Sequence, residues 1–198
     1  MSEIKIILTN LDYNWTMIEN IAVLFSIMYV VLAAKQNIWC WFFAVISTTL
    51  YMHICFTSQL LAETGLQFFY LLMAFYGYYN WNKSETKSKI IQWSTNQHLL
   101  IILLGGFLTF IMGFYLTIYT PAKMPIIDSF TTVFSIIATY MITKKVLENW
   151  LYWIVIDIVS IYLYFTRDLQ LTSLLFIIYT TIAIFGYFSW IQKIKNNV

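Results

Sequence analysis

The strongest constraint in this sequence is a series of apolar stretches, each long enough to cross a lipid bilayer as a helix. Hydrophobic residues make up 61% of the 198 residues and charged residues only 10%, whereas a soluble domain has about 25% charged residues. A spanning helix needs about 20 mainly apolar residues. Segments of this kind are predicted at 18–34, 38–56, 60–81, 99–119, 126–143, 146–165 and 169–191. We therefore expect an all-α integral membrane protein with seven transmembrane helices.

The basic residues predict the orientation of the chain. A net charge of +2 is too small to indicate a nucleic-acid partner. Because the number of spans is odd, the two termini lie on opposite sides of the membrane. The side of the N-terminus holds Lys5, Lys123 and Arg167, and the other side holds Lys35, Lys83, Lys87, Lys89, Lys144, Lys145, Lys193 and Lys195. Because cytoplasmic loops carry the excess of Lys and Arg, we expect the N-terminus outside and the C-terminus in the cytoplasm.

An internal repeat divides the chain. An offset of 109 positions aligns residues 19–81 with 128–190 without a gap, and it pairs Trp41 with Trp150, Gly77 with Gly186, and Trp81 with Trp190. Equivalent helices are four spans apart and point the same way, so the repeat is parallel, as in some transporters. The predicted parts are an extracytoplasmic segment at 1–17, a three-helix bundle at 18–81, a cytoplasmic loop and linker helix at 82–125, a second bundle at 126–192 and a cytoplasmic tail at 193–198.

Polar residues recur at steps of three or four in three of the predicted helices, so those of each helix share one face. They are Glu63, Gln67 and Tyr70 in the third, Asp128, Thr131 or Thr132, Ser135 and Thr139 in the fifth, and Trp150, Trp153, Asp157 and Ser160 in the sixth. Ionisable groups at bilayer depth are costly, and they usually face a bundle interior. Asp157 lies well inside its helix, which favours a ligand-facing role over the alternative, an interhelical hydrogen bond.

A pocket lined by indole and phenol rings and one carboxylate suits a flat aromatic cation, which such rings and an acid both attract. For any single aromatic residue, packing or a place in the interfacial belt is the competing interpretation. His53 and His98 have no partner at metal-ligand spacing, and the sequence has no catalytic or nucleotide-binding motif. We therefore predict no catalytic residue, no metal and no cofactor.

Several short motifs resemble the PnuC family of vitamin transporters over nearly the whole of 19–190. They are Asn-Ile-Trp-Cys-Trp at 37–41, Leu-Gln at 66–67, Tyr-Gly-Tyr-Tyr-Asn-Trp at 76–81, Asp-Ser-Phe-Thr-Thr at 128–132 and Glu-Asn-Trp-Leu-Tyr-Trp at 148–153. The resemblance implies a fold related to the SWEET sugar transporters and assembly as a homotrimer. It also implies facilitated diffusion of a vitamin across a bacterial inner membrane, after which a cytosolic kinase traps the vitamin by phosphorylation.

The resemblance also implies a set of substrate-binding positions, to which the polar face of the third helix adds Glu63. The predicted set is Glu63, Gln67, Tyr70, Thr131, Thr132, Asn149, Trp150, Trp153 and Asp157. Leu61, Glu63 and Phe42 depart from the pattern of many nicotinamide riboside carriers and lean toward the thiamine branch. Both vitamins are aromatic cations, so both stay open. The alternative function is a membrane-embedded sensor or enzyme that binds such a ligand without moving it.

Overall fold

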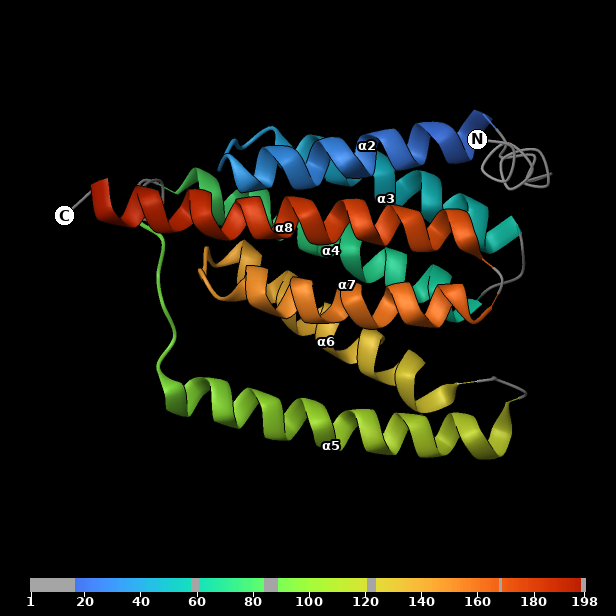
Figure 1. Ribbon diagram of the computed structural model, residues 1–198. Coiled ribbons are helices and arrows are strands. Elements are labelled where there is room, and N and C mark those ends of the chain that lie inside the picture. Colours follow the sequence, from blue (N-terminus) through green and yellow to red (C-terminus); the bar gives the residue numbers. More distant parts are fainter. Residues whose placement is uncertain (1–16, 58–60, 84–88, 121–123, 168, 197–198) are drawn as a thin grey trace, which may run out of the picture.

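Seven α-helices form the part of the chain that this computed structural model describes, residues 17–57, 61–83, 89–120, 124–167 and 169–196 (Figure 1). Their bounds are α2 Met17–Ala34, α3 Cys40–Thr57, α4 Leu61–Asn82, α5 Thr95–Tyr119, α6 Pro125–Thr143, α7 Asn149–Phe165 and α8 Gln170–Asn196. These helices confirm the predicted all-α fold with seven helices. The segment 1–16 and the predicted orientation markers Lys5, Lys87 and Lys123 lie outside the described residues.

Five of the helices, α2, α3, α5, α6 and α8, are long and apolar enough to cross a membrane by length and composition. The other two, α4 and α7, lie among them and run across Figure 1 in roughly the same direction as α2, α5 and α8. α7 is apolar but has only 17 residues. α4 has 22 residues, and polar side chains such as Glu63 and Gln67 interrupt its apolar sequence. The two helices that fall short are thus among those that carry the predicted polar faces.

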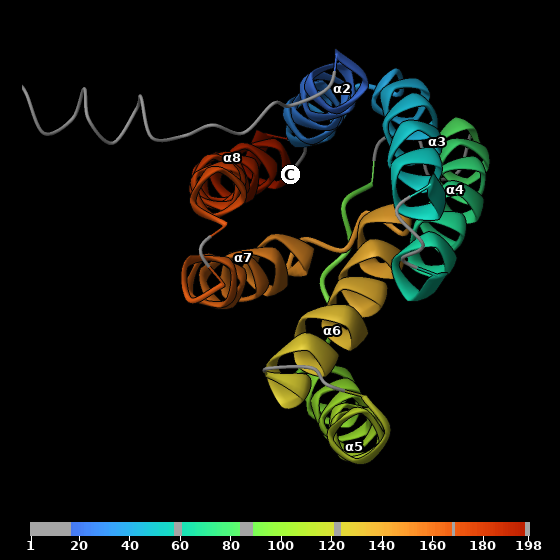
Figure 2. The same ribbon diagram turned by 90° about the vertical axis from the view of Figure 1, so that its right-hand side faces the viewer.

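Six helices close into a ring, and α5 lies outside it. Neighbours pack in the order α2, α3, α4, α6, α7, α8 and back to α2, while α5 packs on α6 (Figure 2). Each half of the repeat contributes an arc of three helices, and the halves meet where α2 packs on α8 and where α4 packs on α6. This is the expected arrangement of two parallel three-helix units with a linker helix between them.

The linker helix approaches α6 closely because small residues line its contact face. Gly105, Thr109 and Gly113, four residues apart, are the buried residues of α5. A Cβ atom on Gly113 would lie 3.0 Å from the Cα atom of Ile126 in α6. Small residues at this spacing let two membrane helices come together, so this face of α5 fixes its position beside the ring.

The turns that join the first two helices of each half have the same backbone form. Gln36 and Lys145 are the residues with positive φ among those described, at 58° and 54°, and the offset of 109 makes them equivalent. The predicted helix starts at 38 and 146 are too early. A turn follows each left-handed residue, with Cys40 N donating to Asn37 O and Asn149 N donating to Val146 O, and α3 and α7 begin only at Cys40 and Asn149.

Candidate functional site

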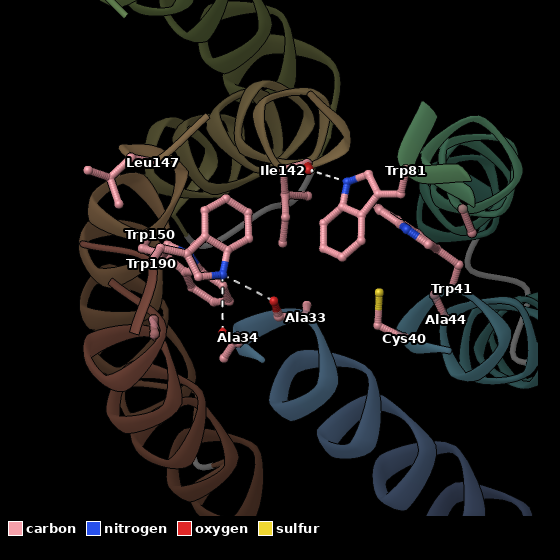
Figure 3. Close-up of a cluster of buried hydrophobic side chains, with 12 residues drawn as sticks. Ala33, Ala34, Cys40, Trp41, Ala44, Trp81, Ile142, Leu147, Trp150 and Trp190 are labelled. Carbon is pink, nitrogen blue, oxygen red and sulfur yellow. Dashed lines mark hydrogen bonds between the residues drawn. The ribbon is translucent and has the colours of Figure 1, made fainter. Parts of the chain in front are cut away.

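Four tryptophans close one end of the ring. Trp41 packs edge-on against Trp81, with ring centres 5.2 Å apart, and Trp150 packs edge-on against Trp190 at 5.5 Å. Trp81 and Trp190 meet across the two halves at 6.2 Å (Figure 3). All four side chains are buried, in a cluster that includes residues of all six ring helices. Side chains therefore fill the ring at this end, which we call the tryptophan end.

The indole N–H groups tie the two halves together at the tryptophan end. Trp81 Nε1 donates to the carbonyl oxygen of Ile142 at 3.1 Å, and Trp190 Nε1 donates to those of Ala33 and Ala34 at 3.2 and 3.1 Å (Figure 3). Ala33 and Ile142 are equivalent under the 109-residue offset, as are the two tryptophans. Each half thus donates to the other through the same bond, which confirms the repeat at the level of single atoms.

The pairing of Trp with Gly in each half has a packing explanation. Trp150 lies flat on Gly186, where an added Cβ atom would be 2.8 Å from three atoms of the indole, and Trp41 covers Gly77 in the same way. The Nε1 atoms of Trp41 and Trp150 are buried and have no hydrogen-bond partner among the described residues. Trp150, a predicted substrate residue, therefore has its ring face covered by Gly186 and an unused donor at its edge.

Asp157 is the buried acid at the middle of α7. Its side chain is 3% exposed, and no hydrogen bond or ion pair joins its carboxyl group to another described residue. The Tyr179 hydroxyl of α8 is close enough to interact electrostatically with the Asp157 carboxyl group. Trp153, one turn nearer the tryptophan end, packs against both buried clusters of the molecule. The predicted inward face of α7 is thus inside the ring, since Leu151, Val155 and Ile158 on its other side are exposed.

Two serine–tyrosine pairs cross between the halves near this level. The Ser26 hydroxyl of α2 bonds the Tyr179 hydroxyl of α8, and the Ser135 hydroxyl of α6 lies near the Tyr70 hydroxyl of α4. The repeat makes these two pairs equivalent. Sequence reasoning singled out Tyr70 but missed Ser26 and Tyr179 as site residues, although the repeat signal that pairs them with Ser135 and Tyr70 could have found them.

The remaining predicted residues differ in their surroundings. Gln67 and Thr132 are half-buried, and the Thr131 hydroxyl donates within its own helix to the carbonyl oxygens of Ile127 and Asp128, at 3.2 and 3.0 Å. Glu63 is exposed, close to the start of α4. The predicted residues therefore do not share one environment: Glu63 is exposed, whereas Asn149, Trp150 and Asp157 are buried.

Asn149 lies beside the tryptophan end at the start of α7. Its side chain is fully buried, and its Nδ2 atom donates to the carbonyl oxygen of Val146 at 2.6 Å. Its Oδ1 atom has no hydrogen-bond partner among the described residues. The first turn of α7 therefore presents a free acceptor on Asn149 and a free donor on Trp150, two groups that a polar ligand can satisfy.

Charge is divided between the two ends of the ring. Lysines surround the tryptophan end, where the Lys145 ammonium lies 4.8 Å from the ring centre of Trp81. Burial, and then the nearby charge of Lys193, lower the pKa of Lys145. At the opposite end Asp128 forms an ion pair with Arg167, and the acid Glu63 is exposed. The end away from the tryptophans thus presents the exposed Glu63 carboxylate, and ammonium groups predominate at the tryptophan end.

Four of the six ring helices are long and apolar enough to cross a membrane, and the ring encloses buried polar side chains, a pattern that in membrane proteins marks a substrate pathway. The model of the nicotinamide mononucleotide transporter family matches residues 16–192. The chain belongs to this family, and it is a multi-pass membrane protein of a family of transporters rather than of enzymes.

Curated relatives agree with this assignment. The chain is 27% identical to the nicotinamide riboside transporter PnuC of Escherichia coli, over 94% of this chain and 89% of that protein. It is 22% identical to the riboflavin/roseoflavin transporter RibM of Streptomyces davaonensis, over 84% and 80%. The crystal structure of the vitamin B3 transporter PnuC superposes with a TM-score of 0.73 at 22% identity, covering 99% of this chain and 89% of that one. That structural likeness confirms the fold.

Proposed function

We propose that this protein carries a small aromatic cationic vitamin, nicotinamide riboside or thiamine, across the bacterial inner membrane by facilitated diffusion. The observation that carries the proposal is the Asp157 carboxyl group, buried inside the ring with no hydrogen bond or ion pair to another described residue. A buried charge without a partner is costly, and a cationic ligand beside Asp157 removes that cost. The names of the relatives, which state nicotinamide riboside and riboflavin, support a vitamin as substrate.

The binding site that we propose uses the predicted residues in different roles. Asp157 supplies the negative charge and Trp153 a ring face, while Trp150 contributes its indole N–H group rather than its covered face. Asn149 and Gln67 supply amide groups, and Tyr70, Thr131 and Thr132 line the wall of α4 and α6. Glu63, exposed near the start of α4, attracts the cation before it enters the ring.

The charged residues at the two ends of the ring indicate how the protein is oriented in the membrane. We propose that the tryptophan end faces the cytoplasm, because lysines gather there and basic loops are cytoplasmic. The opposite end, where Glu63 is exposed, then faces outward, where a cation arrives. A cytosolic kinase that phosphorylates the vitamin prevents its return, and the protein assembles as a homotrimer, as the family resemblance implies.

Transport by purified protein in liposomes tests this proposal. We expect labelled nicotinamide riboside or thiamine to equilibrate across the liposome membrane without being concentrated, and a proton uncoupler to leave the rate unchanged. Liposomes preloaded with unlabelled vitamin should show counterflow of label. Accumulation driven by a proton gradient would reject facilitated diffusion, and binding without counterflow would favour the alternative, a sensor.

A further inference from the structure

A groove runs along the outer side of the contact between α2 and α8, next to the tryptophan end. The volume of this open groove is about 410 Å³. Its lining residues are Val31, Ala34, Lys35, Ile182, Phe185, Phe188, Ser189 and Gln192. Phe185 and Phe188 are 68% and 58% exposed, so the groove opens on the outer surface of the ring.

The lining changes from apolar to polar along the groove. Both helices run toward the tryptophan end, so Val31, Ile182 and Phe185 lie deeper in the bilayer than Lys35 and Gln192. From Ile182 to Gln192 the groove extends about 15 Å along α8, at about 1.5 Å per residue. The apolar part of the groove matches the acyl chain of a lipid. The ammonium, hydroxyl and amide groups at its polar end match the headgroup, which lies nearer the membrane surface than the acyl chain.

The repeat provides an internal comparison for this groove. Its equivalent lies between α4 and α6, where Tyr140, Lys144 and Tyr76 stand in place of Val31, Lys35 and Phe185. There the Lys144 ammonium lies 5.0 Å from the ring centre of Tyr76 and 5.8 Å from that of Tyr140. In this half, two tyrosine rings of the chain itself therefore make cation–π contacts with the lysine.

At the α2–α8 groove, the equivalent lysine is Lys35, and no tyrosine stands at the two equivalent positions, Val31 and Phe185. Lys35 is exposed, and among the described residues its ammonium group makes no cation–π contact. Its carbonyl oxygen accepts a bond from Lys193 Nζ at 2.7 Å, which brings a second positive charge to the polar mouth of the groove. An anionic group at this mouth therefore meets two ammonium groups, whereas a zwitterionic group would also bring a repelled positive charge.

We propose that the groove binds one anionic phospholipid of the leaflet at the tryptophan end. The phosphate accepts from Lys35 Nζ and from the side chains of Ser189 and Gln192, and an acyl chain lies along Val31, Ile182 and Phe185. The lipid bridges α2 and α8, which belong to different halves of the repeat, on the outside of the contact that the Trp190 bonds join on the inside. This site is separate from the vitamin site and does not depend on the transported substrate.

Native mass spectrometry of the protein from bilayers that contain phosphatidylglycerol and phosphatidylcholine in equal amounts tests the proposal. The unaltered protein should retain phosphatidylglycerol preferentially. Lys35→Gln should reduce that preference about fivefold, the usual effect of one lysine near an anionic headgroup. Val31→Trp should remove the bound lipid by filling the groove. Lys89→Gln, an exposed lysine at the same end that does not line the groove, should leave the preference unchanged.

Three results would overturn the proposal. The first is an undiminished preference in Lys35→Gln, a substitution on an exposed side chain that leaves the backbone bond to Lys193 in place. The second is loss of the oligomer in Val31→Trp with unchanged lipid retention, which would make the groove a contact between copies of the chain. The third is displacement of the lipid by glycerophosphate alone, which would make it a site for a free phosphate compound.

Discussion

At the scale of single residues, the two left-handed turn positions differ in what their side chains do. Gln36 and Lys145 are equivalent and both have positive φ, a conformation that costs a residue with a Cβ atom roughly 1–2 kcal/mol. The Gln36 Nε2 atom is buried without a hydrogen-bond partner among the described residues. The Lys145 ammonium, by contrast, lies over Trp81. Strain is thus compensated by a contact at one position and not at the other.

Replacing Gln36 with glycine should therefore stabilise the protein by about 1 kcal/mol, because the strain exceeds the entropy that glycine adds to the unfolded chain. The matched change Lys145→Gly should stabilise it less or destabilise it, since the contact with Trp81 is lost. Thermal unfolding of both variants in detergent measures the difference. An equal rise in Tm for both would contradict this explanation of the turns.

At the scale of elements, helix identity follows from the sequence, and helix boundaries depend on local hydrogen bonds. α5 begins at Thr95 rather than at the predicted 99, because Ser94 and Gln97 form a reciprocal capping box. α7 begins at Asn149 rather than at 146, since Leu147 N donates to the carbonyl oxygen of Ile91 at 2.8 Å. Apolar periodicity carries no information on either bond.

The small-residue face of α5 gives a second test. Gly113→Ala should destabilise the protein by about 1–3 kcal/mol, because the new methyl group meets the backbone of Ile126, which cannot move aside easily. Gly106→Ala in the same helix has nothing within 4 Å of its added Cβ atom. This control should be neutral or slightly stabilising. Similar unfolding temperatures for the two variants would show that α5 does not depend on this contact.

At the scale of the whole molecule, the sequence predicts which residues share a helix face but not which residues of other helices they contact. Spacing of three or four residues fixes a shared face, and on two of the predicted faces Ser135 and Thr139 of α6 and Asp157 and Ser160 of α7 are buried. On the third face, in α4, Glu63 is exposed. The neighbours of each side chain depend on other helices, and so the covered ring of Trp150 and the pair of Asp128 with Arg167 were not predictable from spacing. Binding roles of the predicted residues stay predictions.

The bonds between the halves should keep the tryptophan end closed. Trp190→Phe removes the N–H group that donates to Ala33 and Ala34, a loss of roughly 1–2 kcal/mol. Cys40, which is fully buried in the same cluster, should then react roughly tenfold faster with a water-soluble maleimide in a Cys55→Ser background. Trp39→Phe, at an indole that is 63% exposed, serves as the control. Unchanged labelling of Cys40 would show that these bonds do not hold the end closed.

The most direct test of the account is calorimetric titration of the Asp157→Asn variant with nicotinamide riboside and with thiamine. Loss of the charge should weaken binding of the cationic vitamin by roughly 10- to 100-fold, the range for a hydrogen bond to a charged group, while the unfolding temperature does not fall. Asp128→Asn, at an acid that already pairs with Arg167, should change the affinity little. Unchanged affinity in Asp157→Asn, with a folded protein, would contradict the role of this carboxylate as the counter-charge of the substrate.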